Sequence, residues 1–185
     1  KKYSIKHLGS FFFRIFKYKY FSKKGFFSEM LNKILLFKDY RDFFKGDIRH
    51  IKKDIALGKD SLYLKDIIKE LNSEEKIFLK IDIEGAEYRL LNEIINFQDK
   101  ISGLIIEFHN LDLNIDNVYS FIDKLNLKLV HIHPQNPAPV INNIPTQIEL
   151  TFAKNPQKIS DELSLPHKLD QPANSNIRDI TLVFE

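Results

Sequence analysis

The sequence predicts an α/β fold built around a parallel sheet. Three short apolar runs, at residues 77–83, 101–108 and 127–133, are typical of buried strands, and helical patterns separate them. Strands that alternate with helices indicate a parallel sheet with right-handed crossovers. The chain has 185 residues, of which 43% are hydrophobic, so it is long enough to form one such domain.

The first of these runs leads directly into an acidic turn and a helix. Asp82 and Glu84 are two residues apart, so a continuing strand places both carboxylates on one face. Gly85 supplies a turn, because glycine adopts positive φ at little cost. Glu87 then begins a helix, where an acid suits the helix dipole. A strand, an acidic turn and a helix are typical of the edge at which open α/β sheets bind ligands.

Further elements follow from hydrophobic periodicity and turn residues. We expect a short strand within Gly46–Leu57, a helix from Ser61 or Leu62 to about Asn72, a helix from Asp116 to Leu125, a loop at Pro134–Pro139, an antiparallel or edge strand at Gln147–Ala153, and a small strand at Ile180–Phe184.

Residues 1–45 are predicted as a basic, aromatic, helical segment, and residues 46–185 as the α/β domain. Eight basic residues and no acid lie between Lys1 and Gly25. We expect Gly25 to end a first helix and Ser28 to cap a second one. The simplest interpretation is helices that pack on the core or on another part of the protein. Contact of residues 1–25 with an anionic membrane surface is the alternative, and a nucleic-acid surface is disfavoured because acids balance the charge further along.

Composition and missing motifs exclude several classes of function. The sequence has no cysteine, which excludes disulfides, thiolate catalysis and cysteine-based zinc sites. It also lacks a P-loop and a G-x-S-x-G nucleophile elbow. We see no signal peptide and no apolar run of membrane-spanning length, so a cytoplasmic protein is the default expectation.

Three predicted strands each finish with a pair of side chains on one face. The pairs are Asp82 with Glu84, Glu107 with His109, and His131 with His133. Parallel strands end at the same edge of a sheet and lie about 4.8 Å apart, so we expect all six side chains to converge on one crevice.

Two chemistries fit this constellation. A histidine oriented by a carboxylate is suited to act as general base on a hydroxyl, because imidazole titrates near neutral pH. Alternatively, carboxylates and imidazoles together hold a divalent metal that lowers the pKa of a substrate hydroxyl. The sequence leaves both open and assigns no residue as a dedicated metal ligand.

Residues 79–88, LKIDIEGAEY, resemble the signature of the FkbM family of methyltransferases. The similarity continues in LIIEFH at 104–109, LVHIHPQN at 129–136 and IPTQIELTF at 144–152, and LDQPAN at 169–174 looks like the family's closing segment. The resemblance implies a Rossmann-like methyltransferase sheet and S-adenosylmethionine-dependent O-methylation of a sugar or similar hydroxylated metabolite, with a small-molecule or glycan acceptor as the partner.

The resemblance also implies roles for individual residues. Asp82 and Glu84 would border the cofactor and the reacting hydroxyl, and the acceptor side would hold Glu107, His109, His131, His133 and Asn136. Asp82, Glu84, Glu107 and His109 are the predicted catalytic residues, and His131, His133 and Asn136 the predicted substrate-binding ones.

One feature of the family is missing. Its members carry a glycine-rich turn that cradles the cofactor, but Gly9, Gly25, Gly46 and Gly58 form no such turn. We therefore expect an incomplete sheet in which the edge of the strand at residues 77–83 is exposed. The chain would then be the C-terminal part of a longer protein or a degenerate member of the family, and it would bind the cofactor weakly or not at all. The alternatives are a non-catalytic binding module on the same fold and a metal-dependent hydrolase.

Overall fold

The computed structural model describes residues 23–43, 45, 48–72, 74–157, 165–168 and 170–182. The chain divides into two compact units, residues 1–52 and 53–185. The expected first helix and the predicted contact through residues 1–25 fall almost wholly outside the described residues.

Within the first unit, the structure describes the helix α2, Lys23–Phe43. This helix is unbroken, so the predictions that Gly25 ends a helix and Ser28 caps the next are wrong. A single glycine costs a helix only about 1 kcal/mol relative to alanine, and the neighbouring turns tolerate it here. No helix in the described part of the chain has the length and hydropathy needed to span a bilayer.

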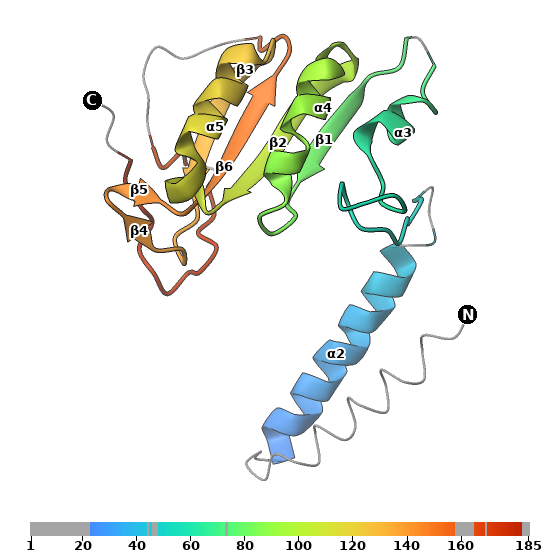
Figure 1. The fold of residues 1–185 in the computed structure, drawn as a ribbon. Helices are drawn as coiled ribbons and strands as arrows, with labels where there is room; N and C mark the ends of the chain where they lie inside the picture. The colour runs from blue at the N-terminus through green and yellow to red at the C-terminus, as the bar shows by residue number, and fades with distance from the viewer. Residues whose placement is uncertain are drawn as a thin grey trace. The chain divides into compact units, whose positions relative to one another are not determined.

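The second unit is a mixed α/β structure (Figure 1). Its elements are α3 (Leu64–Ile68), β1 (Ile77–Ile81), η1 (Glu87–Arg89), α4 (Leu91–Asn96), η2 (Gln98–Lys100), β2 (Ile101–His109), α5 (Leu111–Lys124), β3 (Lys128–Pro134), β4 (Val140–Ile141), β5 (Ile144–Pro145) and β6 (Gln147–Ala153).

The main sheet has the strand order β1-β2-β6-β3. β1 and β2 are parallel, whereas β6 is antiparallel to both of its neighbours, β2 and β3. β1, β2 and β3 therefore run in the same direction, as predicted, but the sheet is mixed rather than wholly parallel. β6 was predicted as an antiparallel or edge strand; it is antiparallel, and it lies inside the sheet between β2 and β3.

The core lies between the sheet and the helices α4 and α5, which cover one of its faces (Figure 1). Alternate residues of β6 point into this core, namely Ile148, Leu150 and Phe152. The residues between them, such as Glu149, face the other side of the sheet. The polar ends of the strands are thus presented on the face opposite these two helices.

Several predicted elements differ in extent. The region 48–57 forms no strand, only a single bridge between Ile55 and Leu62, and the described residues of the predicted strand Ile180–Phe184 are irregular. The helix predicted from Asp116 begins at Leu111, with a kink at Asn114 (φ −131°, ψ 15°) that separates its first turn from the predicted part. The predicted loop after β3 leads into the unpredicted hairpin β4–β5.

Candidate functional site

The site begins in the turn after β1. The strand ends at Ile81, so Asp82 and Glu84 lie beyond it, and the alternation from which they were predicted to share a face does not apply. Glu84 and Gly85 both have positive φ, 56° and 97°. A glutamate in this conformation is uncommon, and such backbone strain is typical of functional sites. It is this left-handed turn, and not strand alternation, that brings both carboxylates to the end of β2.

Glu87 fixes the turn to β2. Its side chain is completely buried, and its Oε1 atom accepts hydrogen bonds from the backbone N–H groups of Ile83 and Gly85, both at 3.1 Å. The same oxygen lies 3.0 Å from Nδ1 of His109. Sequence reasoning treated Glu87 only as the first residue of a helix. The sequence did contain a signal for its role in fixing the turn, because Glu87 comes two residues after the glycine of an acidic turn.

His109 is held in one orientation by that contact. A carboxylate oxygen only accepts hydrogen bonds, so Nδ1 of His109 carries the proton toward Glu87. Tyr88 donates its hydroxyl to the backbone carbonyl of His109 at 2.8 Å. Burial, followed by the charges of Glu87 and Asp112, raises the pKa of Tyr88 to about 12, so the phenol keeps this proton at neutral pH.

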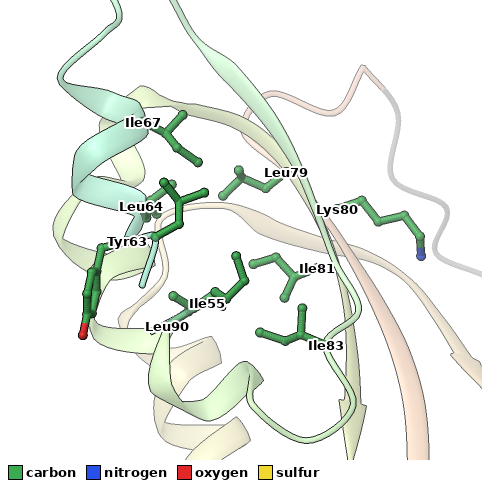
Figure 2. A pocket seen from close by; sticks show the side chains of 10 residues that line it. Ile55, Tyr63, Leu64, Ile67, Leu79, Lys80, Ile81, Ile83 and Leu90 are labelled. Atoms are coloured by element: carbon green, nitrogen blue, oxygen red, sulfur yellow. The ribbon is translucent and has the colours of Figure 1, made fainter. Parts of the chain in front are cut away.

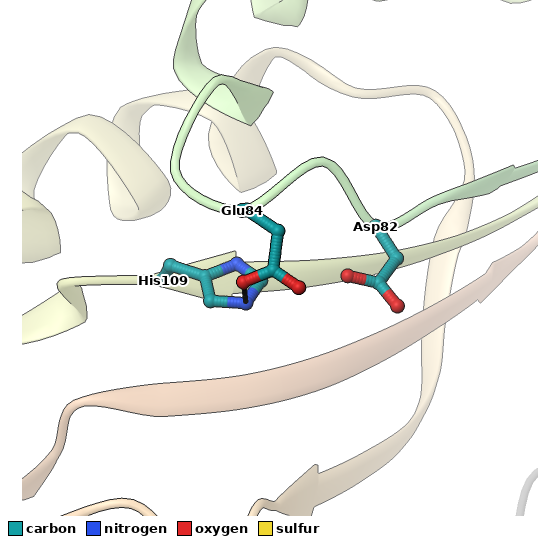
Figure 3. A group of neighbouring side chains, drawn as sticks. All are labelled: Asp82, Glu84 and His109. Carbon is teal, nitrogen blue, oxygen red and sulfur yellow. Dashed lines mark ion pairs between the residues drawn. The ribbon is translucent and has the colours of Figure 1, made fainter. Parts of the chain in front are cut away.

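The other ring nitrogen of His109 faces the carboxylates. Nε2 lies 3.4 Å from Glu84 Oε2 and 3.7 Å from Glu107 Oε1. One ligand atom each of Asp82, Glu84 and His109 lie within 4.8 Å of one another. Figure 3 shows the Glu84 carboxylate beside the imidazole edge, with the Asp82 carboxylate close to it.

Lys80 lies near this group and offsets only part of its negative charge. Within the described part of the chain, no lysine or arginine forms an ion pair with Asp82, Glu84 or Glu107; the nearby Lys80 is bonded to Glu149 at 2.9 Å. Burial first, and then the charge of Asp82, raises the pKa of Glu107. The group therefore concentrates negative charge around one histidine nitrogen.

A polar groove adjoins this group on the side of β3 and β6. It has a volume of about 450 Å³ and includes the predicted residues Glu107, His131 and His133. Its remaining lining residues are Lys80, Gln135, Glu149, Asp170, Gln171 and Ala173. Because β6 lies between β2 and β3, His131 and His133 are displaced from the group around His109, and Glu107 is the residue that the two regions share.

The residues of β3 contact the C-terminal segment. Nε2 of His131 lies 2.8 Å from Asp170, and Nε2 of His133 lies 4.0 Å from Asp179. The buried Asn136 donates its amide to the backbone carbonyls of Asn174 and Ile177, 2.9 and 2.8 Å away. The amide of Asn136, predicted to bind substrate, thus holds the C-terminal segment in place.

A second hollow lies on the helix side of β1. It is apolar, measures about 150 Å³ and lies between α3 and the strand, with Leu79 and Ile81 on its wall. In Figure 2, Lys80 points away from it, to the opposite face of β1. Tyr63 also lines this hollow, but its hydroxyl donates to the backbone carbonyl of Gly58.

Comparison of the chain with models of protein families, with curated proteins and with solved structures gives no significant match.

Proposed function

We propose that this chain is an O-methyltransferase of FkbM type that methylates a hydroxyl of a sugar or similar metabolite. The observation that carries the proposal is the arrangement of Asp82, Glu84 and His109 at the carboxyl ends of β1 and β2. It lies where α/β sheets bind ligands and within the segment that resembles the family signature.

The described residues fit the cofactor in part. The carboxylates of Asp82 and Glu84 suit the positive sulfonium of S-adenosylmethionine because opposite charges attract, although both are exposed and water weakens this attraction. No glycine-rich turn for the adenosine occurs in the described residues, since Gly25 lies in α2 and Gly58 in an irregular turn. We therefore expect weak binding of this cofactor, which supplies the methyl group.

The chemistry assigned to the chain itself is removal of a proton. The acceptor hydroxyl must lose its proton as its oxygen is methylated, and Nε2 of His109 is free to take it while Glu87 holds Nδ1. The charge of the resulting imidazolium is stabilised by Glu87 and Glu84. A divalent ion bound by the same residues would instead lower the pKa of the hydroxyl.

A methyl-transfer assay tests the proposal. The full chain is incubated with S-adenosylmethionine labelled in its methyl group and with a panel of sugars and other hydroxylated metabolites, at a cofactor concentration high enough to offset weak binding. Label is expected in at least one acceptor, and His109→Gln is expected to lower the rate by about 100-fold or more, since proton transfer contributes this much.

The matched control is Asp123→Asn, which removes an exposed acid from the last turn of α5, whereas His109 precedes the first turn of that helix. It is expected to keep the wild-type rate. If the wild-type chain transfers no label to any acceptor, or if His109→Gln transfers it as fast as wild type, the proposal is wrong. The fold would then be interpreted as a non-catalytic binding module.

A second function is favoured by the same residues. Two carboxylates and one imidazole also suit a metal-dependent hydrolase, in which the ion activates water. This alternative predicts release of product from ester or phosphate substrates without S-adenosylmethionine. Methyl transfer without such hydrolysis would exclude it.

A further inference from the structure

We infer that Asp82, Glu84 and His109 bind one divalent cation of the first transition row. The inference concerns binding and holds whether or not the chain transfers methyl groups. If it holds together with the proposed function, the ion is the agent that lowers the pKa of the acceptor hydroxyl.

The orientation of His109 is typical of a metal ligand. Its side chain is nine-tenths buried, and its Nε2 atom points into the group of carboxylates. Nδ1 lies 3.0 Å from Glu87, a carboxylate that is completely buried. Histidines that bind metals almost always donate their second N–H to a carboxylate or carbonyl, which fixes the tautomer and directs the lone pair at the ion. His109 has this arrangement.

The excess of acidic groups around Nε2 also favours a cation. Nε2 of His109 faces the oxygens of Glu84 and Glu107 at 3.4 and 3.7 Å, and a carboxylate oxygen can only accept. No lysine or arginine of the described residues pairs with these carboxylates or with Asp82. A cation between them converts mutual repulsion into attraction.

The size of the group and its ligand types fit such an ion. Ligand atoms about 2.1 Å from one ion lie roughly 3 to 4 Å from each other. The three ligand atoms here lie within 4.8 Å, so a small contraction completes the site. The side chain of Glu84 is 84% exposed and is free to make that movement. Imidazole together with carboxylates favours Mn²⁺, Fe²⁺ or Zn²⁺ over Ca²⁺.

Manganese provides the probe. The full chain is first treated with a chelator and dialysed, and is then titrated with MnCl₂ while the electron paramagnetic resonance signal of free Mn²⁺ is recorded. The expected result is loss of that signal up to one Mn²⁺ per chain, and its recovery when ZnCl₂ displaces the bound ion.

Two variants connect the binding to the site. Glu84→Gln changes an exposed residue of the turn, and Asp82→Asn changes the second carboxylate; each is expected to weaken Mn²⁺ binding at least tenfold. Asp123→Asn on α5 is the control and is expected to bind as wild type does. Circular dichroism confirms that each variant is folded.

Two results would overturn the inference. One is a free Mn²⁺ signal that the wild-type chain leaves unchanged at equimolar concentration. The other is equal affinity in wild type, Glu84→Gln and Asp82→Asn, which places the ion elsewhere. Failure of methyl transfer with intact Mn²⁺ binding would instead count against the proposed function alone.

Discussion

The ends of β1 and β2 differ from the end of β3 in how their polar groups are matched. Around His109, several carboxylates face one ring nitrogen, and in the described residues no lysine or arginine pairs with them. Along β3, Nε2 of His131 is paired with Asp170 of the C-terminal segment at 2.8 Å, whereas the buried Nε2 of His133 lies 4.0 Å from Asp179, too far for a hydrogen bond. Both regions contain the same residue types at strand ends, so residue type alone does not distinguish a site from a structural contact.

The difference teaches which group is organised for a ligand. Matched pairs such as His131 with Asp170 satisfy each other and attach one segment of chain to another. Around His109, Glu87 fixes the orientation of the imidazole at Nδ1, and acidic groups gather on the side of Nε2. Electrostatic preorganisation of this kind is typical of catalytic and metal sites. The four predictions below test this contrast.

The largest expected effect is on stability, at Glu87. Glu87→Ala leaves the half-buried N–H groups of Ile83 and Gly85 and the buried Nδ1–H of His109 without an acceptor, which should lower the free energy of unfolding by about 3 kcal/mol. Asp170→Ala, the matching change beside β3, removes the acceptor of His131 and of the His167 N–H, and should cost only about 1 kcal/mol because water reaches both donors and replaces the acid. Urea denaturation followed by circular dichroism measures both. Equal losses would mean that the two regions do not differ as described.

The next effect is on metal affinity. His109→Ala should weaken Mn²⁺ binding by roughly tenfold or more, because it removes the only nitrogen ligand of the proposed site. His131→Ala should leave the affinity unchanged, since β6 separates His131 from the group. Titration of both variants by electron paramagnetic resonance gives the comparison. Loss of binding in His131→Ala, with His109→Ala unaffected, would reverse the roles given to the two regions.

A smaller effect is expected at Tyr88. Tyr88→Phe removes the hydroxyl that donates to the carbonyl of His109, and should lower the free energy of unfolding by about 1 kcal/mol. The effect should be constant from pH 6 to 9, because the pKa of Tyr88 is raised to about 12 and the phenol stays protonated throughout. Thermal unfolding at several pH values checks this. A loss that varies across this range would show that the phenol is not held as described.

The sequence predicted the features of this fold that depend on local pattern. Apolar runs located β1, β2 and β3, and alternation located β6, because burial on one or both faces of a sheet leaves its period in the sequence. The asparagine pair Asn142–Asn143 was a further local signal that the prediction missed. Both residues have positive φ, as the two-residue turn of the hairpin β4–β5 requires.

What the sequence did not predict depends on pairing between distant segments. Nothing local indicates that β6 inserts between β2 and β3, yet this insertion separates His131 from His109. Similarly, the burial of Glu87 depends on the approach of β2, more than twenty residues further along the chain. Asp82, Glu84 and His109 were predicted together and lie together, but a left-handed turn rather than strand alternation brings the two carboxylates there.

The smallest effect is expected at Glu107, the residue that both regions share. Burial and the charge of Asp82 raise its pKa above the ordinary value of 4.5, so ionised Glu107 opposes folding. The protonated carboxyl contributes stability that is fully present below that ordinary value and is lost as the pH rises through the raised pKa. Glu107→Gln should therefore be slightly more stable than wild type at pH 7. This difference should disappear below pH 4.5, where Glu107 is protonated in the folded and in the unfolded state.

Urea denaturation at pH 7 and pH 4 measures the difference in stability. Glu149→Gln serves as the control, because Glu149 is paired with Lys80 and its variant should lose rather than gain stability at pH 7. If Glu107→Gln is less stable than wild type at pH 7, a cation already balances Glu107, and the contrast between the two regions disappears.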